Sequence, residues 1–511
     1  MKKILTLFVT VLLLTACNKD FLDLNPNDRP SSGTFWKTES DYKMALTACY
    51  GAMQHPHFAQ GLPTWDNLTD NAYGQHNEGQ YGMTIGLSQG NVYANSEGFV
   101  NNVYTYGLKA VMRANIFLRN LEVFSGIDAN TKKRNEAEAR MIRAFFYSYL
   151  YRCYGDVPVI NEVLDLNTQF KAKSPATEVY NFIMQDLDFA IANLPSQPYS
   201  VEKGRWTSNA AKAFKARLIL YTAYDDSGNA IAAKMQEAKT VLASISGYSL
   251  APDFSDNFFD LKQESCPEIM MSVKYLAPNN YTYADLWYGD WIVVSPLANF
   301  MNEFENADGS TATAVAQTNG KVDITAFTNA SMATRDPRMA KTIFVDKFLH
   351  RGVYVTPSNA RATNIGLAKF LSPNLDAPYQ YSTQSQQDWV LMRYADVLLM
   401  KAEVENELSG ASAEVYNYIN QVRTRAGMPN LPAGLSKENM RTRIRHERRV
   451  ELAFEGERYF DLKRWKIAPQ VLNNVTDGIV ARKFESKHYL WPLPQSEIDK
   501  NRGILVQNPN Y

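Results

Sequence analysis

The chain has 511 residues, and its 53 Lys and Arg residues balance 53 Asp and Glu residues. This zero net charge argues against a nucleic-acid-binding protein, which normally carries a basic excess, and against general electrostatic adsorption to a membrane. The length suggests about three domains. The 29 Tyr, 25 Phe and 8 Trp residues serve either the core or flat binding surfaces, because Tyr and Trp combine an apolar face with a polar edge.

The first residues have the pattern of a lipoprotein signal peptide. Lys2 and Lys3 precede the apolar run 4–14, which is too short to span a bilayer as a mature helix. The letters LTAC at 14–17 then resemble a bacterial lipobox. We expect cleavage before Cys17 and its acylation, for example with palmitate, since each buried CH₂ contributes about 0.8 kcal/mol of membrane affinity. The alternative is an ordinary secretory signal followed by an unrelated Cys.

The other cysteines are Cys49, Cys153 and Cys266. They show no C-x-x-C spacing and cannot all pair with one another, so they match neither a disulfide scaffold nor a zinc site. We interpret them as small buried apolar residues.

A polar segment rich in Asn, Pro and Ser follows Cys17 and predicts an extended, lipidated tether. A helix is expected to begin near Ser40, where Ser and Asp precede an apolar-periodic run. From Thr105 to about Leu250, apolar residues recur at helical spacing in consecutive segments with short joints. This pattern favours antiparallel helix pairs.

The helical pattern contains an internal repeat. EVYNFIMQ at 178–185 recurs as EVYNYINQ at 414–421, with six of eight positions identical. Each copy follows another predicted helix, and helix pairs of roughly 34–40 residues are typical of tetratricopeptide-type repeats. The strict repeat signature is missing, and two unrelated amphipathic helices are the alternative. We predict a mainly α fold: a tetratricopeptide-like helical-pair solenoid with a long loop-rich insertion.

The predicted organisation is one intertwined globular body. Its parts are a signal peptide (1–16), a lipidated tether (17–39), an N-terminal half with tetratricopeptide-like helices (40–250), a loop-rich insertion (251–390) and a C-terminal helical region (391–511). The insertion is rich in Asn, Ser, Thr, Pro and Tyr, which indicates loops and short elements. The segment Trp65–Tyr106 has the same composition.

The segment RHERRVELAFEGERYFDLKRW at 445–465 is unusually dense in acids and bases. On a helix, Glu447 and Glu451 lie close to Arg448 and Arg449 at spacings that favour ion pairs. A catalytic pair instead needs two carboxylates that converge on a cleft in different environments. Because each acid here has Arg neighbours, we favour a scaffold over an active site.

Further motifs accompany this charged segment: CNKDFLDLNP at 17–26, FWKTESDYKMALTACYGAM at 35–53, MRYADVLLMKAEVENEL at 392–408, YINQVRTRAGMP at 418–429 and YLWPLPQSEIDKN at 489–501. Together they resemble the SusD/RagB family of outer-membrane nutrient-binding lipoproteins. The resemblance reaches both ends and the helical middle, and it implies a SusD-like fold.

The resemblance also implies a function. Members of this family are anchored to the outer face of the outer membrane by lipid, here through Cys17, and NKD at 18–20 is similar to their surface-export signal. They bind a nutrient, usually a glycan and sometimes a peptide. They cap a SusC-like TonB-dependent barrel transporter, against which the tetratricopeptide-like helices dock. The resemblance implies neither catalytic residues nor a cofactor nor a nucleic-acid partner.

Two loop-rich stretches offer what a sugar requires, because aromatic rings stack on its C–H faces while polar groups bond its hydroxyls. The candidate ligand residues are Trp65, Asn67, Asp70, Asn71 and Tyr73 in the first stretch, and Tyr281, Tyr283, Trp287, Tyr288 and Trp291 in the second. The alternative is that these side chains pack the loops against the helices.

Metal candidates are weaker. His55 and His57 lack a third ligand nearby in the sequence. A structural calcium ion, which takes clustered oxygen ligands, would use Asp253, Asp256, Asp260 and the NADGS segment at 306–310, where plain turns are the alternative. We find no phosphate-binding loop and no nucleophile elbow.

Three functions remain open at this point. The favoured one is capture of oligosaccharides or polysaccharides for a transporter, without catalysis. The second keeps the architecture but captures peptides. The third is a surface glycoside hydrolase that uses carboxylates of the insertion.

Overall fold

The computed structural model describes residues 35–59, 61–74, 84–198, 203–345, 348–350, 353–355, 362–373, 375, 377–475 and 478–511. The predicted signal peptide and Cys17 lie outside these residues. Among the described helices, none is long and apolar enough to cross a membrane.

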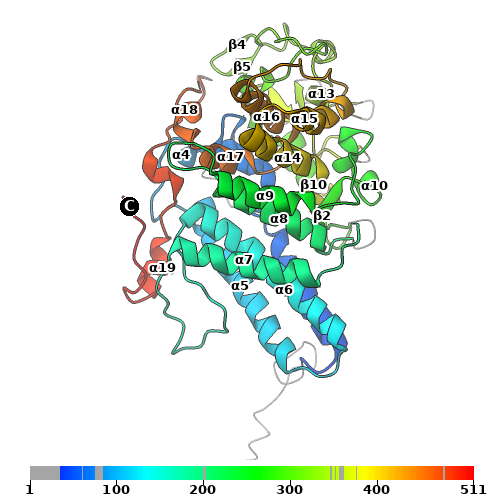
Figure 1. Ribbon diagram of the computed structural model, residues 1–511. Coiled ribbons are helices and arrows are strands. Elements are labelled where there is room, and N and C mark those ends of the chain that lie inside the picture. Colours follow the sequence, from blue (N-terminus) through cyan, green and yellow to red (C-terminus); the bar gives the residue numbers. More distant parts are fainter. Residues whose placement is uncertain are drawn as a thin grey trace, which may run out of the picture.

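The long helices and three short ones near the C-terminus form two blocks that the insertion separates in sequence (Figure 1). The first block contains α2 (Glu39–Gly51), α5 (Phe99–Val123), α6 (Ala129–Tyr154), α7 (Ala176–Asn193), α8 (Ser208–Tyr221) and α9 (Ala232–Ala243). The second contains α14 (Tyr394–Ser409), α15 (Ala413–Arg425), α16 (Lys437–Glu451), α17 (Arg458–Arg464), α18 (Ala468–Leu472) and α19 (Gln495–Lys500).

Local side chains set where several of these helices begin. The Asp128 carboxylate accepts hydrogen bonds from the first N–H groups of α6, and the hydroxyls of Thr207 and Ser436 do the same for α8 and α16. Such caps satisfy backbone donors that have no partner inside the helix. The helix expected near Ser40 begins at Glu39, because Thr38 and Asp41 form a capping box.

The two blocks form one continuous stack. Consecutive helices from α5 to α9 pack against each other, and α14 packs against α15 and α16. The stack continues across the insertion because α9 also packs against α14, although α9 ends at Ala243 and α14 begins at Tyr394. Figure 1 shows this order from α5 and α6 up to α15 and α16.

The internal repeat corresponds to equivalent helices in two pairs. Its copies lie in α7, which packs on α6, and in α15, which packs on α14. The identical positions Val179 and Val415 are fully buried, as are Ile183 and Ile419. The two copies therefore share a buried face, and the predicted mainly α, helical-pair solenoid is confirmed.

Between the blocks the chain forms short elements. The helices are α10 (Asp260–Gln263), α11 (Ala298–Met301), α12 (Asn329–Met332), α13 (Arg338–Thr342), a 3-10 turn η5 (Phe254–Asn257) and a π-helical turn η6 (Asp285–Asp290). The strands are β2 (Ile269–Val273), β3 (Ser295–Pro296), β4 (Gln317–Thr318), β5 (Lys321–Val322), β6 (Ile343–Val345), β7 (Phe348–His350), β8 (Val353–Val355), β9 (Ile365–Leu367) and β10 (Trp389–Arg393).

The strands pair only two by two among the described residues, and every pair is antiparallel. The pair β2–β10 joins the start of the insertion to its end, with Val273 opposite Trp389 and Ile269 opposite Arg393. The chain leaves the helical stack and returns to it at this ladder.

Short elements also occur near both ends of the described chain. They are η2 (Ala52–Gln54), α3 (Leu62–Trp65), η3 (Asp66–Leu68), β1 (Ala72–Tyr73), α4 (Thr84–Ser88) and η7 (Ser486–Tyr489). The segment Leu62–Tyr73 packs into the core beside α17.

The charged segment 445–465 is scaffold in the structure, but its ion pairs differ from those predicted. Glu451 on α16 binds Arg393 at 2.6 Å, Arg338 at 2.9 Å and also Arg425, which lie on three other elements. Burial alone would raise the pKa of Glu451, but the three guanidinium groups outweigh it and hold the pKa well below its usual range. The predicted ladder along one helix is wrong, because this carboxylate finds its partners at a distance in sequence.

The three remaining cysteines, Cys49, Cys153 and Cys266, are buried and unpaired. Burial raises the pKa of each thiol, to about 12 for Cys49 and Cys153 and about 11 for Cys266. They are small buried side chains, as predicted, and a raised pKa disfavours the reactive thiolate.

We expect Glu451→Gln to lower the free energy of unfolding by about 3–5 kcal/mol, because it leaves buried guanidinium groups without their shared anion. Denaturant unfolding followed by circular dichroism measures this. The control is Glu438→Gln on the same helix, whose side chain is 73% exposed and pairs with Arg441. Equal stability of the two variants would show that the Glu451 network does not hold the fold.

Candidate ligand-binding surface

Aromatic side chains from the insertion form a continuous surface patch. We define the aromatic patch as Tyr281, Tyr283, Trp287, Trp291 and Tyr381. The ring of Tyr283 lies 5.5 Å from Tyr281, 5.7 Å from Trp287 and 6.2 Å from Tyr381, measured between centroids. Tyr381 also meets Trp291 edge to face at 5.4 Å.

The rings of the patch differ in exposure. Tyr381 is 67% exposed, Trp287 is 8% exposed, and Tyr281, Tyr283 and Trp291 are intermediate. The hydroxyls of Tyr281 and Tyr283 lie 3.5 Å apart, and this hydrogen bond raises the pKa of Tyr283. A neutral surface of this kind offers apolar faces with hydroxyl edges, which suits a polyhydroxylated ligand.

The backbone under the patch is held from both sides. Thr282 and Ser385 form an antiparallel bridge with N–H···O distances of 2.8 and 3.0 Å, close in sequence to Tyr283 and Tyr381, whose rings are in contact. In η6 the Trp291 N–H donates to the Leu286 carbonyl five residues earlier, at 2.8 Å. Single π-helical turns occur often at functional sites.

A buried acid anchors this turn. Asp285 is fully buried, and its carboxylate accepts a hydrogen bond from the Ser372 N–H at 2.6 Å. Its own N–H donates to the Ser385 hydroxyl at 3.0 Å. Burial is the main reason that the pKa of Asp285 rises to about 7, against the hydrogen bonds from Ser385 and Ser372 that lower it.

Four of the predicted ligand residues of the second stretch therefore lie together in the patch, and they remain predictions as ligand contacts. Tyr288 does not join them: it is fully buried against Phe370 and Trp389. Sequence reasoning missed Tyr381. Its signal was a Tyr-x-Tyr pair within YQYSTQSQQ, a stretch of the same polar composition as the two that we selected.

The structure corrects the first stretch. Trp65 is fully buried, stacked on Trp491 with ring centroids 5.6 Å apart, and its indole N–H donates to the His57 carbonyl at 3.1 Å. Asp70 is also buried and pairs with Arg458 at 2.8 Å and Arg449 at 3.0 Å. Neither side chain has a face left for a ligand.

The two Asn residues of this stretch are scaffold as well. Asn71 accepts a hydrogen bond from Arg449 at 2.8 Å, and Asn67 donates to the Val293 carbonyl at 3.2 Å. Tyr73 is half-buried and pairs with Ser295 through β1 and β3. The first stretch thus lies beneath the backbone that follows Trp291 and supports the patch. Tyr81, in the same stretch, lies outside the described residues.

The metal candidates do not assemble. Among the described residues, no group of three or more His, Cys, Asp or Glu side chains could hold a metal ion. The rings of His55 and His57 are 5.2 Å apart, and burial lowers their pKa values to about 4 and about 3. Asp253 instead pairs with Lys341 at 2.7 Å.

The remaining calcium candidates also have other partners. Asp260 accepts a hydrogen bond from Gln386 at 3.0 Å. Asp308 accepts bonds from the Ser310 N–H and hydroxyl at 2.9 and 2.6 Å, which makes the 306–310 segment a plain Asx turn. The structure therefore favours turns over a calcium site.

Comparison with family models assigns both halves of the chain. Residues 254–511 match the model described as the SusD family. The chain belongs to the SusD family. Residues 20–220 match a second model, described as starch-binding and associating with the outer membrane.

Curated relatives align over most or all of the chain. A SusD-like protein (P2) of Formosa agariphila is 26% identical and covers 100% of both chains. The starch-binding protein SusD of Bacteroides thetaiotaomicron is 23% identical over 78% of this chain and 76% of its own.

Solved structures have the same fold. A SusD-like protein of Bacteroides fragilis superimposes with a TM-score of 0.78 and 26% identity, covering 96% of this chain and all of the other. A laminarin-binding SusD-like protein, 23% identical, superimposes with a TM-score of 0.69 over 93% of this chain and all of its own. The predicted SusD-like fold is confirmed.

We expect the Asp285 carboxyl to make stability depend on pH. Because its pKa is about 7 when folded and about 4 when unfolded, the folded state binds the proton more tightly. The stability that this proton contributes is therefore present at low pH and is lost as pH rises through about 7. Melting temperatures of Asp285→Asn and wild type should diverge in favour of the variant between pH 4 and 7.

The control for this experiment is Asp188→Asn, whose side chain is 61% exposed. Its melting curve should run parallel to wild type across the same range. A parallel curve for Asp285→Asn as well would mean that Asp285 is ionised throughout.

Proposed function

We propose that this chain is a cell-surface lipoprotein that captures oligosaccharides and delivers them to a SusC-like TonB-dependent outer-membrane transporter. The aromatic patch carries this proposal. It presents several rings at different angles, on a backbone fixed by the Thr282–Ser385 bridge and by η6. Family members named as binding starch and laminarin support a glycan as the cargo.

The patch also favours binding over hydrolysis. A glycoside hydrolase needs two carboxylic groups flanking the scissile bond, one of them with a raised pKa. Asp285 is the acid with a raised pKa beneath the patch, but it is fully buried and held by backbone and hydroxyl groups. It cannot reach a sugar oxygen above the rings. The hydrolase hypothesis would require measurable sugar release by the purified chain.

The proposal of a lipid anchor rests on the lipobox at 14–17 and on the match to a family model whose description includes association with the outer membrane. Lipid at Cys17 would hold the protein at the surface, and the tether would let the folded body move against a barrel transporter. The protein would not need to catalyse a reaction in this arrangement, because it would bind the glycan and the transporter would import it.

We expect binding heat in calorimetry with at least one neutral glycan and none with a mixed peptide digest. The panel includes starch-derived and laminarin-derived oligosaccharides, after the names of the relatives. The full chain is titrated in detergent. Heat with peptides alone would replace the glycan proposal by the peptide hypothesis and reduce the patch to packing.

We expect Tyr381→Ala and Trp291→Ala each to weaken glycan binding by roughly twofold to tenfold, since a stacked aromatic contact contributes about 0.5–1.5 kcal/mol. The melting temperature should change little for Tyr381→Ala, because that side chain is mostly exposed. The matched control is Tyr93→Ala, an exposed tyrosine outside the patch. Unchanged affinity in both patch variants would contradict the assignment of the site.

We expect Cys17→Ala to release the protein from the membrane fraction, because no acyl chain can then be attached. Fractionation followed by immunoblotting measures this. The control variant Asn18→Ser leaves Cys17 in place and should remain anchored. Retention of Cys17→Ala in the membrane would rule out the lipobox interpretation.

A further inference from the structure

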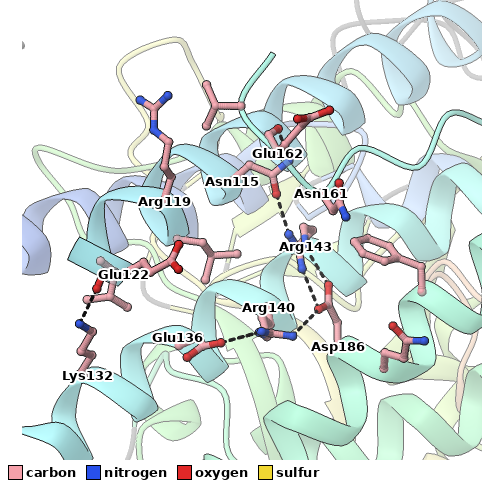
Figure 2. A pocket seen from close by; sticks show the side chains of 15 residues that line it. Asn115, Arg119, Glu122, Lys132, Glu136, Arg140, Arg143, Asn161, Glu162 and Asp186 are labelled. Atoms are coloured by element: carbon pink, nitrogen blue, oxygen red, sulfur yellow. Dashed lines mark hydrogen bonds and ion pairs between the residues drawn. The ribbon is translucent and has the colours of Figure 1, made fainter. Parts of the chain in front are cut away.

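A second concave site lies away from the aromatic patch. A pocket of about 810 Å³ opens between α5, α6, α7 and the 161–163 segment, all in the first helical block (Figure 2). Its volume is within the range of small-molecule sites, about 300–1,000 Å³. Its lining residues are all described, and most of them are charged or amide side chains.

The floor of the pocket is a rigid network. Arg143 donates to both Asp186 oxygens at 2.8 Å and to the Asn115 side-chain oxygen at 2.7 Å. The Asn115 amide in turn donates to the carbonyls of Ile160 and Glu162 at 2.9 and 3.0 Å. Because both Arg143 and Asp186 are buried, the network fixes the shape of the floor before any ligand arrives.

The rim differs from the floor. Arg140 is paired with Glu136, but Arg119 and Glu122 on α5 have no side-chain partner in the part of the chain that the structure describes. The side-chain amides of Asn161 and Gln185 likewise make no hydrogen bond within it. Figure 2 shows Arg119 and Glu122 on α5 and Asn161 on the 161–163 segment.

These groups define the chemistry of a ligand. The uncommitted rim offers one cation, one anion and two amides, so it supplies both hydrogen-bond donors and acceptors. A polyanion would meet Glu122 and a polycation would meet Arg119, both unpaired among the described residues, and repulsion between like charges disfavours both ligands. A hydroxyl both donates and accepts, so a neutral polyhydroxylated molecule can satisfy all of these groups at once.

We propose that this pocket is a second binding site, for a short neutral saccharide, on the helical block and independent of the aromatic patch. Asp186 and Arg143 form its fixed polar floor, and Arg119 and Glu122 close around the hydroxyls at the rim. The saccharide class follows here from the charge balance of the pocket, and the proposal does not need the patch to bind.

The test uses the full chain in detergent and titrates neutral trisaccharides (maltotriose, laminaritriose, xylotriose and cellotriose) by calorimetry. Alanyl-alanine serves as a zwitterionic probe and a glucuronate-containing disaccharide as an anionic one. Three proteins are compared: a patch variant (Trp291→Ala with Tyr381→Ala), a rim variant (Arg119→Met with Glu122→Met) and the two combined. Exposed Lys133→Met on α6 is the control for charge loss outside the pocket.

At least one neutral trisaccharide should still bind the patch variant. Adding the rim substitutions should weaken this remaining binding roughly tenfold or more, because a hydrogen bond to a charged group contributes about 1.5–3 kcal/mol. Lys133→Met should leave it unchanged. Arg119 and Glu122 are exposed and have no side-chain partner among the described residues, so their replacement should not unfold the chain.

Several results would overturn the proposal: no trisaccharide binding to the patch variant, binding that the rim substitutions do not change, or rim-dependent binding of the dipeptide or the anionic sugar instead. A failure of the proposed function would look different. The patch substitutions would then leave all glycan binding intact, while the rim substitutions would abolish it.

Discussion

Burial of arginine–carboxylate pairs is the constraint on which this architecture depends. Glu451 gathers Arg338 from α13, Arg393 from β10 and Arg425 from α15 around one carboxylate. Removing such ions from water costs several kcal/mol for each ion, and only complete pairing offsets it. The network therefore fixes where the long insertion returns to the helical stack, because Arg338 and Arg393 come from the insertion and its end and find their shared anion on α16.

A second network links this scaffold to the aromatic patch. Asp70 pairs with Arg449 and Arg458, which fixes the segment 62–74 against α16 and α17. From there, Asn67 bonds the Val293 carbonyl, and β1 pairs with β3 immediately after the patch. The backbone that carries Trp287 and Trp291 therefore rests on ion pairs nearly four hundred residues apart in sequence. The acid–base groups hold the site in place, and among the neutral rings Tyr381 is the most exposed.

The sequence predicted what local periodicity determines. The helical stack followed from apolar spacing, and the identical pairs Val179/Val415 and Ile183/Ile419 marked the same buried face in two helix pairs. The sequence could not distinguish two kinds of aromatic residue beside Asn and Asp. One kind faces solvent, and the other is buried beside polar neighbours that bind partners far away in the sequence. Trp65 and Trp291 share the same local composition, yet Asp70 and Asn71 pair with Arg449 across the chain, and Trp65 is buried against Trp491.

The same long-range pairing explains why Tyr381 was missed. Its role depends on the bridge between Thr282 and Ser385, a contact that no local pattern encodes. The bridge matters because each ring that stacks on a sugar contributes only a small part of the binding free energy. The affinity therefore depends on how much conformational entropy the rings lose on binding. In η6 the i to i+5 bond from Trp291 to Leu286 and the Asp285–Ser372 bond hold the turn before a ligand arrives. Because the turn is already fixed, little conformational entropy is lost on binding, and the weak contacts of the individual rings can add up to a useful affinity.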